Sequence, residues 1–171
     1  MPGSVELFAR YRNPVFIETG SWDGDGILRA LAAGYEEVYS CEIEAGDYGH
    51  CVERFGKNPR VQLANADSGE WINRVLHDLD RPATIFLDAH SVPRGCPIER
   101  ELLEIANRPH CVETLIIDDM RMIRGGSEWA KGMRDTEIIQ KVLAIDARFW
   151  IGYESDSHDP RDILIATRRP R

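Results

Sequence analysis

The chain has 171 residues, of which 43% are hydrophobic, and its formal net charge is −8. This length suits one domain with a sizeable core, so we expect residues 1–171 to form a single domain with a short N-terminal segment at 1–13. The acidic balance argues against a nucleic-acid binder, which usually carries a basic patch, but it leaves a local basic groove open.

Two further features bear on the environment of the chain. No apolar run reaches the ~20 residues of a membrane helix, and the first residues lack the basic and then apolar pattern of a signal peptide. The four cysteines are scattered, without a Cys-x-x-Cys pair. We therefore expect a cytoplasmic protein with reduced thiols, no membrane partner and no structural zinc.

Helical and extended patterns alternate along the chain. We expect helices at 4–11, 24–33, 45–55, 69–79, 98–106 and 133–145, and strands at 14–19, 37–41, 61–64, 84–88, 114–118, 148–153 and 162–167. This alternation predicts an α/β fold with a doubly wound, mostly parallel sheet and helices on both faces. The last two strands read as an antiparallel pair. The stretch 120–132, which contains Gly125-Gly126, reads as mobile.

The first strand runs into a glycine turn with the spacing Glu18-x-Gly20-x-x-x-Gly24-x-Gly26. Strand, glycine turn and helix are typical of a nucleotide-binding crossover, but the dinucleotide fingerprint is Gly-x-Gly-x-x-Gly. This turn also carries Glu18, Asp23 and Asp25. Each carboxylate at ~4 Å from a pyrophosphate charge would cost roughly 1 kcal/mol even in water. The turn therefore favours a cationic ligand.

Every strand expected to be parallel ends in acidic residues. In open parallel sheets, ligands bind outside the carboxyl ends of the strands, so these residues would meet at the ligand-binding edge. The acidic residues are Glu18, Glu42, Asp67, Asp88, Asp118 and Asp119. Glu42 lies 22 residues after Gly20, where an acid that binds ribose hydroxyls is expected; alternatively it is a solvated loop carboxylate. Asp67 is either a ligand or a helix N-cap paired with Glu70.

The turn spacing and the strand order resemble those of the class I S-adenosylmethionine-dependent methyltransferases, over about residues 15–167. That resemblance implies a Rossmann-like seven-stranded sheet whose antiparallel seventh strand inserts between the fifth and sixth. It also implies a set of donor contacts. Gly20, Ser21, Gly24 and Gly26 would approach the methionine part, Glu18 and Asp23 the ammonium, Glu42 the ribose, and Asp67 with Ser68 the adenine, against which Ile43 would pack. Trp71 would either join Ile43 or belong to the core.

Asp88 at the fourth strand, with Asp118 and Asp119 at the fifth, resembles the metal-dependent O-methyltransferases and within them the macrocin O-methyltransferase and cephalosporin hydroxylase-like group. The resemblance implies that Asp88, Asp118 and Asp119 hold Mg²⁺ or another divalent cation, for which carboxylate oxygens are suitable ligands. His90 would act as general base beside Asp88 or bind the metal, and a loop histidine without either role fits equally well. The expected acceptor is a hydroxyl of a small molecule or saccharide.

Other interpretations stay open. A nicotinamide-dependent oxidoreductase, a hydroxylase-like enzyme and a non-catalytic binding module share the strand pattern. The short segment before the first strand predicts an open acceptor site, closed by residues 120–132 or by a second subunit of a homo-oligomer. Arg121, Arg124 and Lys131 in that stretch would contact an anionic acceptor or face solvent.

Overall fold

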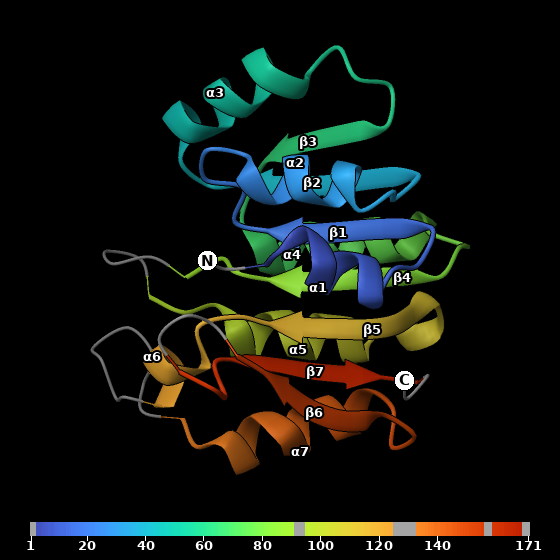
Figure 1. Cartoon of the computed structure of the whole chain (residues 1–171), viewed down its shortest axis with the longest axis vertical. Coiled ribbons are helices and arrows are strands. Elements are labelled where there is room, and N and C mark those ends of the chain that lie inside the picture. Colours follow the sequence, from blue (N-terminus) through green and yellow to red (C-terminus); the bar gives the residue numbers. More distant parts are fainter. Residues whose placement is uncertain (1–2, 91–94, 125–132, 156–158, 169–171) are drawn as a thin grey trace.

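The computed structural model describes residues 3–90, 95–124, 133–155 and 159–168. They form one seven-stranded sheet in the order β3-β2-β1-β4-β5-β7-β6, with helices packed against it (Figure 1). The strands are β1 (Val15–Thr19), β2 (Glu37–Glu42), β3 (Val61–Asn65), β4 (Ala83–Leu87), β5 (Val112–Ile117), β6 (Trp150–Glu154) and β7 (Ile163–Thr167). β1 to β5 pair in parallel, and β7 is antiparallel to both of its neighbours, β5 and β6. The insertion of the seventh strand between the fifth and sixth is thereby confirmed.

The helices also follow the expected order. They are α1 (Val5–Arg10), α2 (Asp25–Ala32), α3 (Ala45–Phe55), α4 (Ser68–Asp78), α5 (Ile98–Ala106), α6 (Met120–Arg124) and α7 (Asp135–Ile145), with a 3-10 turn at Pro109–Cys111. Their ends carry local signals. Ser4 accepts a hydrogen bond from the Leu7 amide at the start of α1, and Gly34 takes a positive φ of 89° just after α2.

One expectation about secondary structure was wrong in part. The first five residues of the stretch expected to be mobile, Met120–Arg124, form the helix α6, and Met120 and Ile123 bury their side chains in the core. Burying these two apolar residues gives the short helix a reason to form. Residues 125–132, including Gly125 and Gly126, lie outside the described residues.

The sheet separates two apolar cores. On one face Phe16, Val38 and Ile116 pack with α1, α2 and α3, and on the other face Ile17, Ile85 and Leu115 pack with α4, α5 and α7. Figure 1 shows α1 and α2 in front of the sheet and α4 and α5 behind it. Neighbouring residues of one strand thus serve opposite cores, as the period of two requires. Helices on both faces, and hence the doubly wound α/β class, are confirmed.

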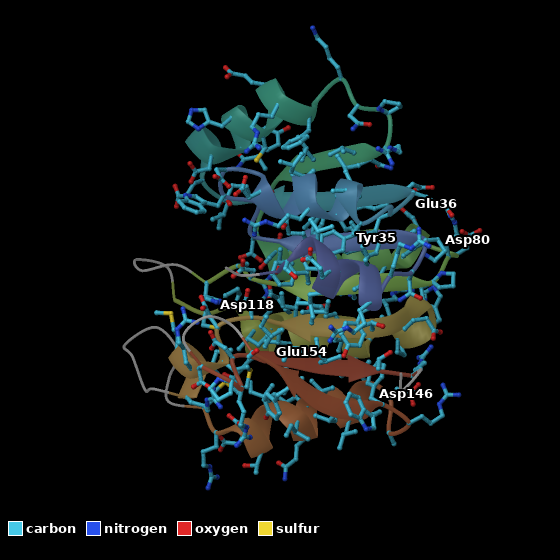
Figure 2. The ribbon with its side chains drawn as sticks, viewed as in Figure 1. Tyr35, Glu36, Asp80, Asp118, Asp146 and Glu154 are labelled. Atoms are coloured by element: carbon cyan, nitrogen blue, oxygen red, sulfur yellow. The ribbon has the colours of Figure 1, made fainter. Side chains whose placement is uncertain are left out.

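This topology brings the carboxyl ends of the five parallel strands to one edge, on the left in Figure 1. Asp118 lies at that edge, whereas Glu36 and Asp80 lie at the opposite one (Figure 2). Because β7 runs the other way, its first residues also start from the edge where β5 ends. The acidic strand ends therefore face a common region. Among the described helices, none has the length and apolar character that a bilayer crossing demands.

Candidate functional site

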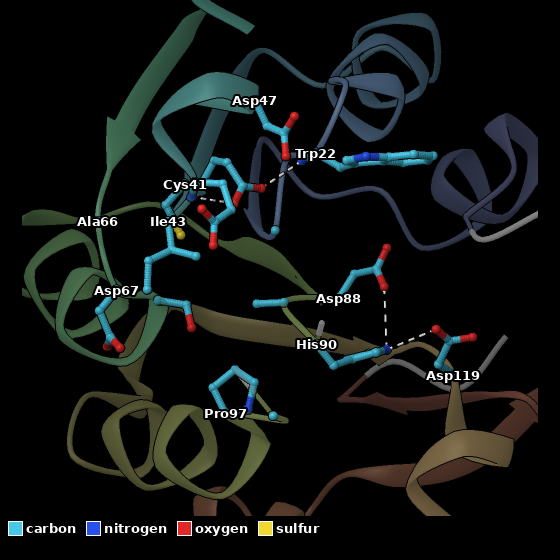
Figure 3. Close-up of a pocket in the computed structure, with 16 residues that line it drawn as sticks. Trp22, Cys41, Ile43, Asp47, Ala66, Asp67, Asp88, His90, Pro97 and Asp119 are labelled. Carbon is cyan, nitrogen blue, oxygen red and sulfur yellow. Dashed lines mark hydrogen bonds and ion pairs between the residues drawn. The ribbon is translucent and has the colours of Figure 1, made fainter. Parts of the chain in front are cut away.

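A cavity of about 450 Å³ opens at this edge of the sheet (Figure 3). Its wall comes from the segments that follow β1 to β5 and from the segment that leads into α5. The lining residues are Gly20, Trp22, Cys41, Glu42, Ile43, Glu44, Asp47, Ala66, Asp67, Ser68, Asp88, Ala89, His90, Gly95, Pro97 and Asp119. The structure thus brings together residues from every parallel strand end.

Gly20 shapes the floor of this cavity. It has a φ of 81°, and a Cβ built on it would lie 2.7 Å from the carbonyl oxygen of Asp88. A side chain at position 20 would therefore be strained and would collide with backbone. The amides of Gly20 and Ser21 both donate to the Cys41 carbonyl, at 3.0 and 3.1 Å. The turn after β1 is fixed between the ends of β2 and β4.

Glu18 lies beneath the turn and does not line the cavity. It is 2% exposed, and its Oε2 accepts a hydrogen bond of 2.6 Å from Ser40, whose hydroxyl lies 2.7 Å from that of Ser21. Burial raises the pKa of the Glu18 carboxyl to about 8, although the hydrogen bond from Ser40 opposes the shift. Glu18 and Ser21, for which we expected ligand contacts, instead lie outside the cavity lining and support the turn from below. Both residues are buried and hold the loop through Ser40.

The other carboxylates of the turn are also turned away from the cavity. Asp25 forms ion pairs with Arg29 at 3.1 Å and with Arg54 at 3.6 Å. The carboxylate of Asp23 accepts from the Asp25 amide at 3.1 Å, and neither residue lines the cavity. Gly24 and Gly26 belong to the start of α2 and lie outside the wall as well. The negative charge of the cavity wall therefore comes from carboxylates outside this turn.

Glu42, by contrast, lies in the wall where the sequence places it. Its Oε2 accepts from the Trp22 amide and its Oε1 from the Glu44 amide, each at 2.9 Å. These two bonds tie the turn after β1 to the segment after β2 and fix the carboxylate at the cavity. The structure therefore argues against a freely solvated loop carboxylate. Ile43, 39% exposed, lies beside it in the lining.

Asp67 serves as the N-cap of α4, because its Oδ1 accepts from the Glu70 amide at 3.2 Å. The same oxygen is 3.1 Å from Arg100, which also pairs with the carboxylate of Glu70. Asp67 and Ser68 both line the cavity, so the cap does not exclude a ligand contact. Trp71 is 6% exposed and packs in the core, which confirms the core interpretation for that residue.

Asp88, His90 and Asp119 converge at one end of the cavity (Figure 3). His90 Nε2 lies 3.1 Å from Asp119 Oδ2 and 3.6 Å from Asp88 Oδ1. Burial by itself lowers the pKa of His90, but hydrogen bonds with Asp119 and Cys96 and the charge of Asp88 outweigh it and raise the pKa to about 10. Burial and the charge of Asp118 raise the pKa of Asp88.

The three carboxylates predicted to share one metal ion are divided between two groups of closely spaced ligand atoms. Asp88 and Asp119 meet His90 in the first group, and Asp118 and Asp119 meet Asp162 in the second, with ligand atoms within 4.8 Å of one another in each. Asp118 is 0% exposed and its Oδ1 accepts from the Asp119 amide at 2.7 Å. Strand β5 ends at Ile117, and the chain then turns through Asp119, whose φ is 52°, so Asp119 takes part in both groups whereas Asp118 takes part in the second alone.

The donor set of the first group fits a divalent cation. Two carboxylate oxygens and an imidazole nitrogen are ligands that such ions accept in proteins. A ligating nitrogen must be unprotonated, so an ion bound there would replace the proton that His90 holds in this arrangement.

The arginines expected to meet an acceptor or solvent are instead paired within the protein. Arg121 pairs with Asp119 and Asp162, and Arg124 with Asp135 and Asp159. Both side chains are partly exposed, and neither lines the cavity. Lys131 lies outside the described residues.

Several residues of the site were not anticipated from the sequence. The lining includes Trp22, Cys41, Glu44, Asp47 and Pro97, which lie next to predicted residues in the chain. A buried acid outside the lining is found only through the fold. Glu101 on α5 is 1% exposed, and burial raises the pKa of its carboxyl. Its position on the buried stripe of α5, one residue before Leu102, is the only sequence signal.

The cavity wall is strongly acidic. Six of its residues carry carboxylates, namely Glu42, Glu44, Asp47, Asp67, Asp88 and Asp119, and no lysine or arginine joins them within the described ranges. The expected negative edge is therefore present, although only four of these six residues were predicted. At ~4 Å each further like charge costs roughly 1 kcal/mol in water and more near protein. This wall disfavours a phosphate-bearing ligand and suits a cationic one.

The sequence matches no protein-family model, and its comparison with curated proteins gives no significant match. The structure resembles a methyltransferase of Podospora anserina solved with SAH, at a TM-score of 0.65 and 13% identity over 97% of this chain and 76% of that one. It also resembles an O-methyltransferase family protein of Burkholderia thailandensis (TM-score 0.62, 14% identity, 96% and 53% covered). A third likeness is to an rRNA methylase of Streptococcus thermophilus, at a TM-score of 0.57 and 13% identity over 95% of this chain and 92% of that one. At such identities the likeness establishes the fold, which is the Rossmann-like fold of these methyltransferases.

Proposed function

We propose that this chain is an S-adenosylmethionine-dependent methyltransferase. The observation that carries the proposal is the carboxylate-lined cavity at the carboxyl edge of a methyltransferase-like sheet. S-adenosylmethionine carries a sulfonium and an ammonium and has no phosphate, so an acidic wall attracts it. When bound, this cofactor supplies an already activated methyl group. The protein then has mainly to align an acceptor behind that group.

The donor end of the cavity is assigned to the residues that follow β1, β2 and β3. Glu42 accepts the ribose hydroxyls, since its two oxygens are already oriented by the Trp22 and Glu44 amides. Asp67 and Ser68 receive the adenine amino group, with Ile43 against the ring. Gly20 lets the backbone approach the methionine part. Glu18 and Ser21 keep this loop in place from below.

The acceptor end is assigned to Asp88, His90 and Asp119. These residues would hold a divalent cation such as Mg²⁺, which lowers the pKa of a bound hydroxyl. We propose O-methylation of a small molecule or saccharide on this basis. We include His90 among the residues that would bind the cation, because its Nε2 lies between the carboxylates of Asp88 and Asp119. Asp119 and Asp88 orient the imidazole and fix its distance from the donor end.

Calorimetric titration tests the donor assignment. S-adenosylmethionine and S-adenosylhomocysteine should bind and NAD should not, because the pyrophosphate of NAD would face the acidic wall. Glu42→Gln should weaken S-adenosylmethionine binding by about 1.5–3 kcal/mol, the value of hydrogen bonds to a charged group. The matched control is Glu53→Gln, an exposed glutamate on α3 outside the cavity lining, which should leave the affinity unchanged. Binding of NAD alone would overturn the proposal.

A second experiment addresses the acceptor end. Methyl transfer to vicinal hydroxyls should fall after treatment with a chelator and in Asp119→Asn, while S-adenosylmethionine affinity stays close to that of the wild type. Asp80→Asn removes an exposed carboxylate at the opposite edge of the sheet and serves as the control (Figure 2). Full activity of Asp119→Asn in the presence of chelator would refute the cation role and leave the donor site intact.

A further inference from the structure

We infer that Arg121 is a built-in cation that occupies the second acidic group, formed by Asp118, Asp119 and Asp162. Of the two such groups among the described residues, it thereby leaves that of Asp88, His90 and Asp119 open to exchangeable divalent cations. The role of Arg121 in its own group follows from the contacts of that group. The statement about the neighbouring group rests on the proposed function.

The second acidic group needs a positive charge. Its three carboxylates place oxygen atoms within 4.8 Å of one another, and both Asp118 and Asp162 are 0% exposed. Water therefore screens these charges poorly, and like charges this close and this buried repel strongly. Such a group is stable only with a cation between its members or with protons on its carboxyls.

The guanidinium of Arg121 meets this need with two separate contacts. Its Nη1 pairs with Asp162 Oδ2, and its Nη2 lies 2.8 Å from Asp119 Oδ1. Its backbone amide also donates to Asp162 Oδ1 at 2.8 Å, and the Met120 amide donates to the Asp162 carbonyl at 2.8 Å. The start of α6 is thus fixed to the residue before β7. The guanidinium, whose donors form a rigid fork, is thus a cation fixed inside this group.

Arg121 also acts on the neighbouring group through the carboxylate that both groups share. Asp119 Oδ1 pairs with Arg121, and its other oxygen, Oδ2, bonds His90. Asp119 holds a φ of 52°, a conformation unusual for a residue other than glycine, which neighbours must stabilise. Arg121 is therefore a positioning residue. It keeps one oxygen of Asp119 inside the protein and directs the other toward the cavity.

The test is the number of divalent ions that each variant binds, without S-adenosylmethionine. Arg121→Met keeps an unbranched apolar stem and removes the charged guanidinium. This variant should bind one Mn²⁺ more per chain than the wild type, measured by calorimetry. Its melting temperature should rise roughly 5–10 °C more than that of the wild type at a Ca²⁺ concentration about a hundred times Kd. The control is Arg124→Met on the same helix, whose partners Asp135 and Asp159 belong to neither group.

The double variant Arg121→Met/Asp162→Asn should lose the additional ion. Equal stoichiometry in wild type and Arg121→Met would overturn the inference, and so would an additional ion that persists in the double variant. Failure of Arg121→Met to fold even in saturating Ca²⁺ would count against it as well, because the ion should replace the guanidinium. If the wild type binds no ion and Arg121→Met binds one, the role of Arg121 in its own group stands, and the statement about the neighbouring group fails together with the cation role in the proposed function.

Discussion

The contact between Glu18 and Gly26 gives a sharp test of how the turn is held. A Cβ at position 26 would lie 1.7 Å from Glu18 Oε1, whereas real contacts of this kind stay above 3.0 Å. In a close-packed interior the carboxylate would have to retreat by roughly 1.3 Å. That movement would break its 2.6 Å hydrogen bond with Ser40. Gly26→Ala should therefore be destabilising although it lies in a helix.

The magnitude follows from two opposing effects. Overpacking and the lost hydrogen bond cost about 2–4 kcal/mol together, and the better helix propensity of alanine returns about 0.5–1 kcal/mol. We expect a net loss of about 1–3 kcal/mol in urea denaturation at pH 7. Gly49→Ala in α3 is the control, because a Cβ there meets nothing within 4 Å, and it should be neutral or stabilising.

A double-mutant cycle separates this contact from a general effect of the turn. In a Glu18→Ala background the Cβ at position 26 gains room, so Gly26→Ala should cost far less there than in the wild type. An equal cost in both backgrounds, or no cost in the wild type, would refute the reasoning.

Three further predictions concern single residues. The pKa of Glu18 is raised to about 8, so its contribution to stability is fully present below the unfolded value of 4.5 and is lost as pH rises through 8. Between pH 5 and pH 9 the wild type should lose about 4 kcal/mol more unfolding free energy than Glu18→Gln in urea denaturation, and parallel pH profiles would contradict this. Asp67→Asn should keep α4 capped and the melting temperature within a few degrees while weakening S-adenosylmethionine binding in calorimetry, whereas Asp67→Ala should also lose about 1 kcal/mol of stability. Trp22, which is 70% exposed in the cavity wall, should report ligand binding by a fluorescence change that Trp22→Phe abolishes, and an unaltered signal in that variant would place the ligand elsewhere.

The fold was predictable from the sequence because its patterns are local. Strand β4 is apolar except for Thr84, and α4 begins after the N-cap Asp67, so composition and caps place both elements. The edge of the sheet at which the candidate site residues meet follows from the parallel arrangement of the strands alone. Glu42, Asp67 and Asp88 were located in this way, because each lies at the end of its strand or within two residues of it.

The remaining part of the site depends on contacts that local patterns do not contain. Glu18 is the fourth residue of β1, within the strand expected at 14–19, but the sequence does not show that its side chain is buried against Ser40 of β2. Asp118 and Asp119 are adjacent and share the second group, yet only Asp119, whose φ is positive, also reaches the group of Asp88 and His90. For Asp162 the sequence contained one usable signal. Asp162 lies at the start of the strand expected at 162–167. Because that strand was expected to run antiparallel, the start of the strand, and not its end, reaches the acidic edge.

The placement of β7 also has a consequence for the order in which the molecule assembles. β6 and β7 are close in sequence and can pair locally, whereas the pairing of β7 with β5 joins segments about 50 residues apart and closes a longer loop. Asp162 therefore reaches Arg121 only when this hairpin docks. Until then the acidic edge lacks the residue that anchors α6. Docking of the C-terminal hairpin and completion of the site are thus one event. During refolding, the recovery of S-adenosylhomocysteine binding should therefore proceed at the same rate as docking of the hairpin.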